Sequence, residues 1–204
     1  MIKEALSAGA GYLLGSLNSG VILSKLGYLD DIRSHGSGNA GATNMARVFG
    51  WGAGILTLGC DVGKSVASMA IGKKLGGDTG LAAAGAGCLA GHCWPAYHHF
   101  KGGKGVSVGV GIALMTGPAV FYTAAGAFAA GALATKKVSV GSVCAAIMLP
   151  LSVVLFKASK PKQLLCAGTA AVVLWEHRPN IRRLLNRTEP DFKAGRHRRF
   201  GAKA

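Results

Sequence analysis

Long apolar runs separated by short polar connections limit most strongly how this chain can fold. Half of its 204 residues are apolar, and the mean hydropathy is positive. Most of these runs are close in length to the roughly 20 residues that an α-helix needs to cross a bilayer. The runs lie at about residues 5–29, 51–71, 79–97, 105–135, 138–156 and 163–175. This pattern predicts an all-α, polytopic integral membrane protein.

The number of helices follows from the lengths of these runs. The run at 105–135 is too long for one helix and contains the step Gly117-Pro118, which favours a helix break. We therefore expect about seven transmembrane helices, some of them short. The first run has Glu4 near its start and no clear cleavage signal, so we interpret it as a retained helix. Residues 1–204 then form a single membrane-embedded domain with a basic tail from about residue 190.

The placement of basic residues predicts the orientation of the chain. The net charge is +15, and 15 of the 23 Lys and Arg residues lie in four connections on one side. These connections are residues 30–50, 98–104, 136–137 and the tail from residue 177. By the positive-inside tendency they face the cytoplasm, with the N-terminus outside and the C-terminus cytoplasmic. Because the tail follows directly on a membrane span, attraction to anionic lipid explains its arginines better than nucleic-acid binding.

Three polar clusters stand at the ends of apolar runs. Residues 35–47 combine glycines, small polar side chains and Arg47, which indicates a site where backbone N–H groups and a guanidinium hold an anion. A flexible linker is the alternative. Residues 98–105 join a glycine-rich turn to Lys101 and Lys104 at the start of a helix, although two interfacial lysines would also explain them. Residues 177–189 begin with His177, either a general base, a positioning group or a merely interfacial residue.

Other polar residues favour structural roles. Asp61 and Lys64 lie three residues apart in the second run, so we expect them to neutralise one another on one helix face. Five cysteines form no CxxC pair, and no spacing typical of metal ligands is present. We therefore expect no metal site and no cofactor. No histidine is followed five residues later by Asp, so the His-Asp acyltransferase signature is absent.

Taken in order, the three clusters resemble the three motifs of the bacterial acyl-phosphate-dependent glycerol-3-phosphate acyltransferases, the PlsY family. Residues 31–47 are similar to the first motif, residues 91–106 to the second and residues 177–189 to the third. The resemblance covers nearly the whole chain. One departure is Asn18-Ser19, where many relatives have proline, and another is Pro179 within the third motif, which fits a helix start.

The resemblance implies transfer of a fatty acyl group from acyl phosphate to the 1-hydroxyl of glycerol 3-phosphate. The products are lysophosphatidic acid and phosphate, in the first acylation of bacterial phospholipid synthesis. The expected location is the cytoplasmic (inner) membrane, with the active site on its cytoplasmic face. The implied partners are the two substrates and the lipid bilayer, with no nucleic acid.

The resemblance also implies roles for individual residues. The implied catalytic residues are Ser37, Arg47, Lys104, His177 and Asn180. The implied substrate-binding residues are Gly36, Gly38, Asn39, Thr43, Asn44, Lys101, Gly102, Gly103, Gly105 and Glu189. Family enzymes also use a serine after the fifth span, and either Ser139 or Ser142 fills that place. We favour a phosphate oxygen of the acyl donor as the base, with His177 positioning the hydroxyl.

Two other function classes remain at this point. A small anion transporter or channel would also need broken helices whose N-termini face a phosphate, but it predicts polar groups deep in the membrane. A lipid-binding scaffold would depend on the basic tail and would not need Ser37, Arg47 or His177. Deletion of the tail beyond Arg196 separates the scaffold from the enzyme.

Overall fold

The computed structural model describes residues 1–195, and over this range the chain forms helices and no strand. Two short 3-10 turns, Ile32–Ser34 and Ala96–His98, lie in the connections. The α-helices are α1 (Ile2–Ser16), α2 (Ser19–Tyr28), α3 (Ala42–Phe49), α4 (Trp51–Cys93), α5 (Val106–Thr116), α6 (Pro118–Thr135), α7 (Val138–Leu155), α8 (Lys160–Glu176) and α9 (Arg178–Leu185). The all-α prediction is confirmed.

Within residues 1–195, four helical stretches are long and apolar enough to cross a membrane. They are Ile2–Tyr28, Trp51–His98, Pro118–Thr135 and Val138–Leu155, and Val106–Thr116 is a shorter apolar helix. Helix α4 is itself two helical segments, because Gly76 and Gly77 leave the helical conformation and reverse the chain. Gly117 separates α5 from α6, as expected from the Gly117-Pro118 step. Pro179 lies in the first turn of α9, where its missing N–H is not needed.

The first apolar run differs from the single helix expected. It breaks at Leu17, and Asn18 begins α2 by accepting a hydrogen bond from the Val21 N–H at 3.2 Å. The Leu17 carbonyl that the break frees accepts from Lys64 Nζ at 2.8 Å. Within α4, Lys64 also forms the expected ion pair with Asp61, at 2.7 Å. Asn18 is a local signal for this break, whereas the Lys64 ammonium that satisfies the freed carbonyl comes from a distant part of the chain.

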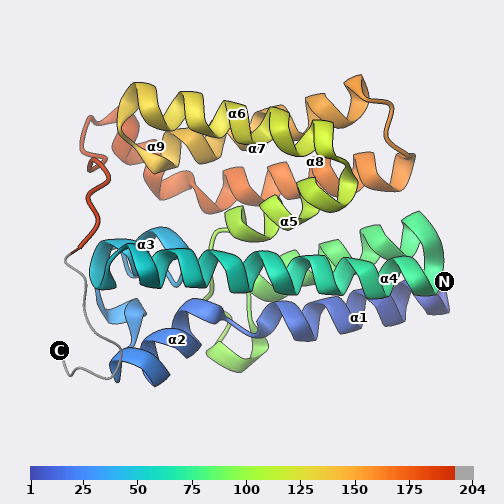
Figure 1. The fold of residues 1–204 in the computed structure, drawn as a ribbon, viewed down its shortest axis with the longest axis horizontal. Coiled ribbons are helices and arrows are strands. Elements are labelled where there is room, and N and C mark those ends of the chain that lie inside the picture. Colours follow the sequence, from blue (N-terminus) through green and yellow to red (C-terminus); the bar gives the residue numbers. More distant parts are fainter. Residues whose placement is uncertain (196–204) are drawn as a thin grey trace.

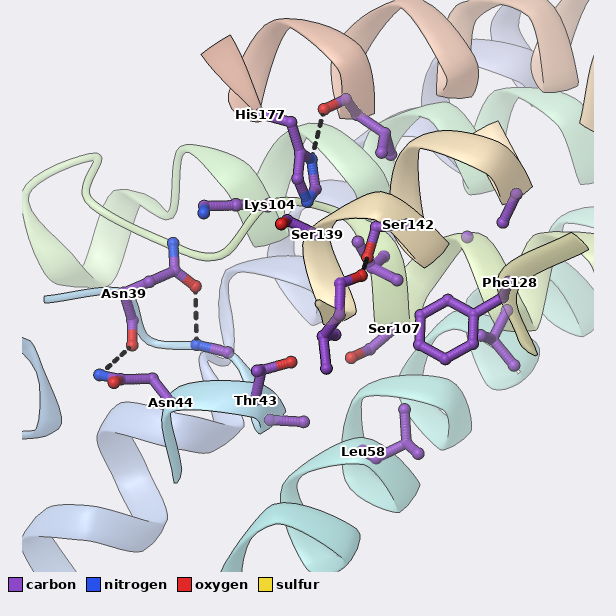
Figure 2. Close-up of a pocket in the computed structure, with 18 of the residues that line it drawn as sticks. Asn39, Thr43, Asn44, Leu58, Lys104, Ser107, Phe128, Ser139, Ser142 and His177 are labelled. Carbon is purple, nitrogen blue, oxygen red and sulfur yellow. Dashed lines mark hydrogen bonds between the residues drawn. The ribbon is translucent and has the colours of Figure 1, made fainter. Parts of the chain in front are cut away.

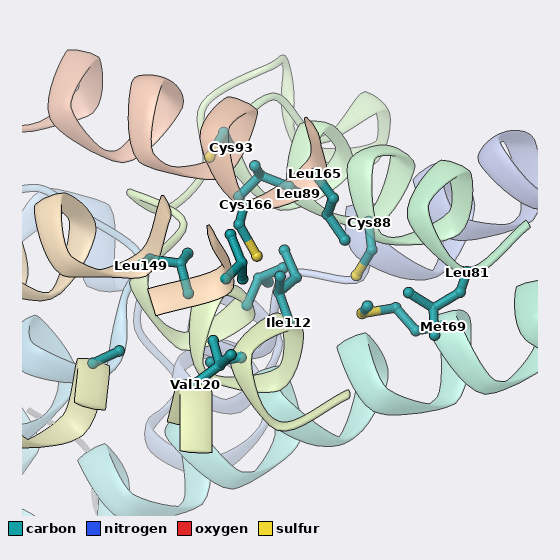
Figure 3. Close-up of a cluster of buried hydrophobic side chains, with 14 residues drawn as sticks. Met69, Leu81, Cys88, Leu89, Cys93, Ile112, Val120, Leu149, Leu165 and Cys166 are labelled. Atoms are coloured by element: carbon teal, nitrogen blue, oxygen red, sulfur yellow. The ribbon is translucent and has the colours of Figure 1, made fainter. Parts of the chain in front are cut away.

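The helices form two layers. Figure 1 shows α1–α4 in one layer and α6–α9 in the other, with α5 between them. A cluster of buried apolar side chains from α4 to α8 joins the layers, as Figure 3 shows. Its members include Met69, Leu81, Leu89, Ile112, Leu149 and Leu165, together with the free thiols Cys88, Cys93 and Cys166.

Contacts between connections distinguish the two ends of the bundle. At one end, Asp78 in the return of α4 accepts from Ser159 Oγ at 2.5 Å. At the other end, Arg33 donates to the His98 carbonyl at 3.2 Å, and Lys137 pairs with Asp191 at 2.6 Å. The second end therefore brings together the four basic connections that contain the three polar clusters.

Candidate active site

The side chain of Asn44, at the start of α3, shapes the first polar cluster. Its Nδ2 donates to the carbonyl oxygens of Ile32, His35 and Asn39 at 3.3, 2.9 and 2.9 Å. Its Oδ1 accepts from the Ser37 N–H at 2.9 Å. Since Asn44 is only 2% exposed, these bonds are protected from water. They hold the loop before α3 in one conformation.

Gly36 allows this loop to lie close to Asn44. Its φ of +58° is in the left-handed region, and a Cβ at this position would lie 2.3 Å from Asn44 Oδ1. Both observations require a residue without a side chain. Thus a cluster that resembled a flexible linker in composition has a defined backbone.

Arg47 lies one turn along α3 from Asn44 and lines a cavity between the two helix layers. Among residues 1–195, its guanidinium has no hydrogen-bond or ion-pair partner from another side chain. Ser37, Asn39 and Thr43 line the same cavity. A cation without a protein partner beside hydroxyl and amide groups is suited to bind an oxyanion.

The second cluster places Lys104 at the cavity. The Gly102 N–H donates to the Cys93 carbonyl at 3.1 Å, and the Gly103 N–H donates to the His92 carbonyl at 3.0 Å. These bonds fix the chain against the end of α4 directly before Lys104. Gly105 then caps α5 with a φ of +81°.

The Lys104 ammonium is partly desolvated and close to other cations. It donates to Asn180 Oδ1. Burial lowers the pKa of Lys104, and the nearby guanidinium groups of Arg183 and Arg47 lower it further. An anion bound among these three cations would relieve their repulsion, so the site favours a negatively charged ligand.

The third cluster begins where α8 ends. His177 is 3% exposed, and its Nδ1 lies 2.7 Å from the Val173 carbonyl oxygen, which can only accept. The ring proton is therefore on Nδ1, and Nε2, which has no partner among the described residues, is the acceptor. Burial lowers the pKa of His177 to about 4, so the ring is neutral at pH 7 and a weak base.

Asn180 and Glu189 connect the third cluster to the second. Asn180 Nδ2 donates to Glu189 Oε1 at 2.7 Å, while Arg183 Nε donates to Glu189 Oε2 at 2.6 Å. Because Asn180 also accepts from Lys104, one hydrogen-bond chain orders these four side chains. Glu189 thus holds the amide of Asn180 in the orientation that receives the ammonium.

The two candidate serines of α7 differ in their partners. Ser142 Oγ donates to the Val138 carbonyl within its own helix at 3.0 Å. Ser139 Oγ is buried and has no hydrogen-bond partner within residues 1–195, although it lies close enough to Glu189 to lower the pKa of that carboxyl. Both serines line the cavity, but Ser139 has the hydroxyl that a ligand could engage.

The cavity has a volume of about 990 Å³ and walls of two kinds. Figure 2 shows Asn39, Thr43 and Lys104 around its polar part, with His177 and Ser139 close together, and Leu58 and Phe128 in its apolar part. The apolar wall also includes Ile55, Val110, Phe121, Ala145 and Leu149. A ligand with an anionic end and an apolar end would match both parts.

The structure brings most of the predicted site residues together. Those that line the cavity are Gly36, Ser37, Asn39, Thr43, Asn44, Arg47, Lys104, Ser139, Ser142, His177, Asn180 and Glu189. Gly38, Gly102, Gly103, Gly105 and Lys101 are not among its lining residues. Lys101 is exposed, and the three glycines from 102 to 105 pack against α4 and shape the backbone around Lys104.

Sequence reasoning did not single out four polar residues of the cavity wall. They are His92, Ser107, Arg183 and Thr169, the last of which lies within α8 and outside the three motifs. His92 and Ser107 lie in or beside the second motif and Arg183 lies in the third, so their positions were available as a signal. What was not available is the fold that turns these side chains toward the same cavity.

Comparisons with known proteins agree with this arrangement. A family model described as glycerol-3-phosphate acyltransferase matches residues 5–187. A glycerol-3-phosphate acyltransferase from Syntrophotalea carbinolica is 42% identical over 190 residues, which cover 91% of this chain and 95% of the relative. One from Thermoanaerobacter pseudethanolicus is 38% identical over 184 residues, covering 90% and 93% of the two chains.

Solved structures have the same fold. The crystal structure of PlsY, an integral membrane glycerol 3-phosphate acyltransferase, in its glycerol 3-phosphate form matches with a TM-score of 0.87 and 30% identity. The match covers 93% of this chain and 96% of that one. The lysophosphatidic acid form matches with a TM-score of 0.85, 29% identity and coverage of 93% and 95%.

Proposed function

The chain belongs to the PlsY family of glycerol-3-phosphate acyltransferases, and from this we propose that it transfers a fatty acyl group from acyl phosphate to the 1-hydroxyl of glycerol 3-phosphate. It is an integral membrane acyltransferase. The products of the proposed reaction are lysophosphatidic acid and inorganic phosphate. The single observation that carries this proposal is the cavity, which combines the cations Arg47 and Lys104 with a long apolar wall.

The proposed roles follow the chemistry of each side chain. Arg47, Lys104 and the Ser37 loop hold phosphate oxygens and stabilise the negative charge on the departing phosphate. Ser139 donates its unpaired hydroxyl to a substrate oxygen. Thr43 and Asn39 complete the polar wall, and the apolar wall receives the acyl chain.

The proton of the attacking hydroxyl goes to the donor phosphate in the proposed mechanism. The hydroxyl oxygen forms a bond to the acyl carbon, the bond from that carbon to the phosphate oxygen breaks, and phosphate leaves with the proton. Before this step, His177 Nε2 accepts a hydrogen bond from the hydroxyl and orients it, and the O–H then turns to the phosphate oxygen that takes its proton. Its lowered pKa of about 4 supports this division, because so weak a base gains little by accepting the proton itself.

We extend the proposal to the membrane topology. Seven spans, with the N-terminus outside and the C-terminus cytoplasmic, would place all three clusters on the cytoplasmic face of the inner membrane. The two segments of α4 and the helices α5 to α8 supply six spans, and α1 with α2 supplies the first. The gathering of the basic connections at one end supports this topology.

An anion transporter is less consistent with the arrangement of polar groups. Their clusters lie at helix ends, and the deeper Asp61 and Lys64 are bonded to one another. A scaffold that depends on its basic tail does not need the ordered chain from Lys104 to Glu189.

The donor can be tested directly with the purified protein. Acyl phosphate, acyl-CoA and acyl carrier protein are each supplied with glycerol 3-phosphate, while phosphate and lysophosphatidic acid are measured. We expect product from acyl phosphate alone. Product from either thioester but not from acyl phosphate would contradict the proposal, and Arg47→Ala is the matched inactive control.

A further inference from the structure

His92 lies between the buried ion pair of α4 and the cavity. It is 2% exposed, and it lines the cavity although the proposed mechanism assigns it no role. One edge of its ring faces Lys64, with Nδ1 3.2 Å from the Lys64 Nζ. The other ring nitrogen, Nε2, is therefore the one that a ligand could contact, and its protonation decides whether His92 donates or accepts a hydrogen bond there.

The hydrogen bonds of Lys64 determine the tautomer of His92. An ammonium has three N–H donors and no acceptor. Lys64 directs them to the Leu17 carbonyl at 2.8 Å, to Asp61 Oδ1 at 2.7 Å and to His92 Nδ1 at 3.2 Å. The distance from His92 Nδ1 to Asp61 Oδ1, 3.6 Å, is longer than a hydrogen bond. His92 Nδ1 is thus an acceptor, and the ring proton is on Nε2.

Asp61 keeps this arrangement neutral overall. Its carboxylate is fully buried and also accepts from Ser19 Oγ at 2.8 Å, across the break between α1 and α2. A buried ammonium without this partner would be strongly disfavoured. The charge of Asp61 therefore allows Lys64 to remain an ammonium beside the ring.

The protonated nitrogen of His92 lies beside the backbone that carries Lys104. A Cβ built on Gly103 would lie 2.1 Å from His92 Nε2, and the Gly103 N–H donates to the carbonyl of His92 itself at 3.0 Å. Within residues 1–195, Nε2 has no hydrogen-bond partner. His92 lines the cavity beside Lys104, so its N–H donor lacks only an acceptor, which a bound ligand could supply.

We propose that His92 is a further substrate-binding residue, whose Nε2–H donates to a phosphate oxygen of a bound substrate, and that Lys64 and Asp61 are positioning residues that hold its tautomer. The inference rests on the proposed function, which supplies two substrates with phosphate groups. The phosphate of glycerol 3-phosphate and that of the acyl donor offer the same acceptor chemistry. This neutral and directional N–H donor would act together with the cations Arg47 and Lys104 and with the Ser37 loop.

Two variants of His92 distinguish a role as hydrogen-bond donor from a role in packing alone. His92→Phe fills a similar volume without a donor, whereas His92→Gln places an amide N–H near the position of Nε2. We expect His92→Phe to weaken phosphate binding about tenfold or more, the usual effect of losing a hydrogen bond to a charged group, and His92→Gln to restore most of it. The matched control is His99→Phe, at an exposed histidine in the connection between α4 and α5, and we expect it to keep the parental affinity.

The measurements distinguish the two phosphates. Calorimetry gives the Kd of glycerol 3-phosphate and of inorganic phosphate, and steady-state assays give the KM of each substrate. If Kd or KM rises only for glycerol 3-phosphate, His92 binds the phosphate of glycerol 3-phosphate. If KM rises only for acyl phosphate, His92 binds the phosphate of acyl phosphate. Unchanged affinity in His92→Phe overturns the proposal. So does an equal loss in the Phe and Gln variants together with a lower Tm, because it indicates packing alone.

The positioning role has its own readout in the nitrogen NMR spectrum of labelled histidine. The parent protein should show a protonated Nε2 and an unprotonated Nδ1 at His92. The double variant Asp61→Leu/Lys64→Met removes both charges together, and we expect a mixture of tautomers with severalfold weaker binding. A proton on Nδ1 in the parent, or on Nε2 alone in the double variant, overturns this role. Calorimetry and NMR need no turnover, so a failure of the proposed acyl transfer would appear only in the assays.

Discussion

A single residue, Asn44, holds a glycine-rich segment in one defined conformation. Glycines allow the backbone to approach other groups closely, but they do not favour one backbone conformation. Four hydrogen bonds from the Asn44 side chain to the surrounding loop stabilise one conformation. A sequence motif can therefore indicate the kind of ligand, while one buried amide determines whether the loop is ready to bind it.

The pH dependence of the enzyme provides a test of the role of His177. Burial lowers its pKa from 6.5 to about 4, so the ring stays neutral over the range in which a free histidine titrates. We expect kcat/KM to show no limb from His177 near pH 6.5. Its contribution to stability should be complete above pH 6.5 and decline as the pH falls toward 4, because the unfolded chain then binds the additional proton.

The measurements are pH profiles of kcat/KM and Tm for the parent and for His177→Gln. His177→Ala should slow turnover by about a hundredfold or more. A limb that both proteins share belongs to the substrates. A limb near pH 6.5 that only the parent shows would indicate that His177 is the base.

Close contact between α1 and the returning segment of α4 depends on paired glycines. Gly11 and Gly15 lie one turn apart on α1, and Gly87 and Gly91 lie one turn apart on α4. A Cβ on any of them would lie 2.1–2.2 Å from a carbonyl oxygen of the opposite helix. This spacing of small residues lets membrane helices approach backbone to backbone.

Adding one methyl group to this contact should separate the helices. We expect Gly11→Ala to lower the free energy of unfolding by about 1–3 kcal/mol, because its Cβ would meet the Ala84 carbonyl. Gly9→Ala on the same helix has no atom within 4 Å of the new Cβ and should be neutral or slightly stabilising. Thermal unfolding of both variants in one detergent measures the difference, and equal Tm values would contradict the packing argument.

Hydropathy predicted the all-helical fold of an integral membrane protein because the bilayer requires continuous apolar length. It missed the break at Leu17 because Ile2–Tyr28 as a whole is apolar enough to span despite the polar residues around Leu17, and because the lysine that satisfies the freed carbonyl lies on α4. It also could not choose between Ser139 and Ser142, which lie in the first turns of α7. In the structure Ser142 donates to the Val138 carbonyl, whereas Ser139 Oγ has no hydrogen-bond partner within residues 1–195.

At the scale of the whole molecule, residues 186–195, which follow α9, connect the two helix layers through side-chain and backbone contacts. Asp191 pairs with Lys137 beside α7, and Phe192 packs edge-on against Trp51 at 5.1 Å between ring centroids. The Gly195 N–H then donates to the Ala46 carbonyl at 3.0 Å. Figure 1 shows this segment running from α9 toward α3. Since Pro190 and Phe192 also line the cavity, the segment is part of the site.

Two truncations test whether these contacts between the layers contribute to activity. Removing residues 196–204 deletes Arg196, Arg198 and Arg199, which lie outside the described residues, and should leave activity within about twofold of the parent. Ending the chain after Pro190 also removes Asp191 and Phe192. We expect this shorter chain to lose roughly tenfold to a hundredfold in kcat/KM, because displaced binding groups cost about that much. Assays of both chains in the same vesicles measure the effect, and loss of function in the longer chain would instead favour the scaffold hypothesis.

The break at Leu17 has a consequence for the biogenesis of the protein. A ribosome delivers this segment first, and the amine that satisfies its freed carbonyl is 47 residues further along the chain. In hydrocarbon an unsatisfied backbone carbonyl costs several kcal/mol. We therefore expect the segment around Leu17 to reach its broken form only after α4 has inserted beside it. Although it is synthesised before its partner, this segment should be among the parts that mature late.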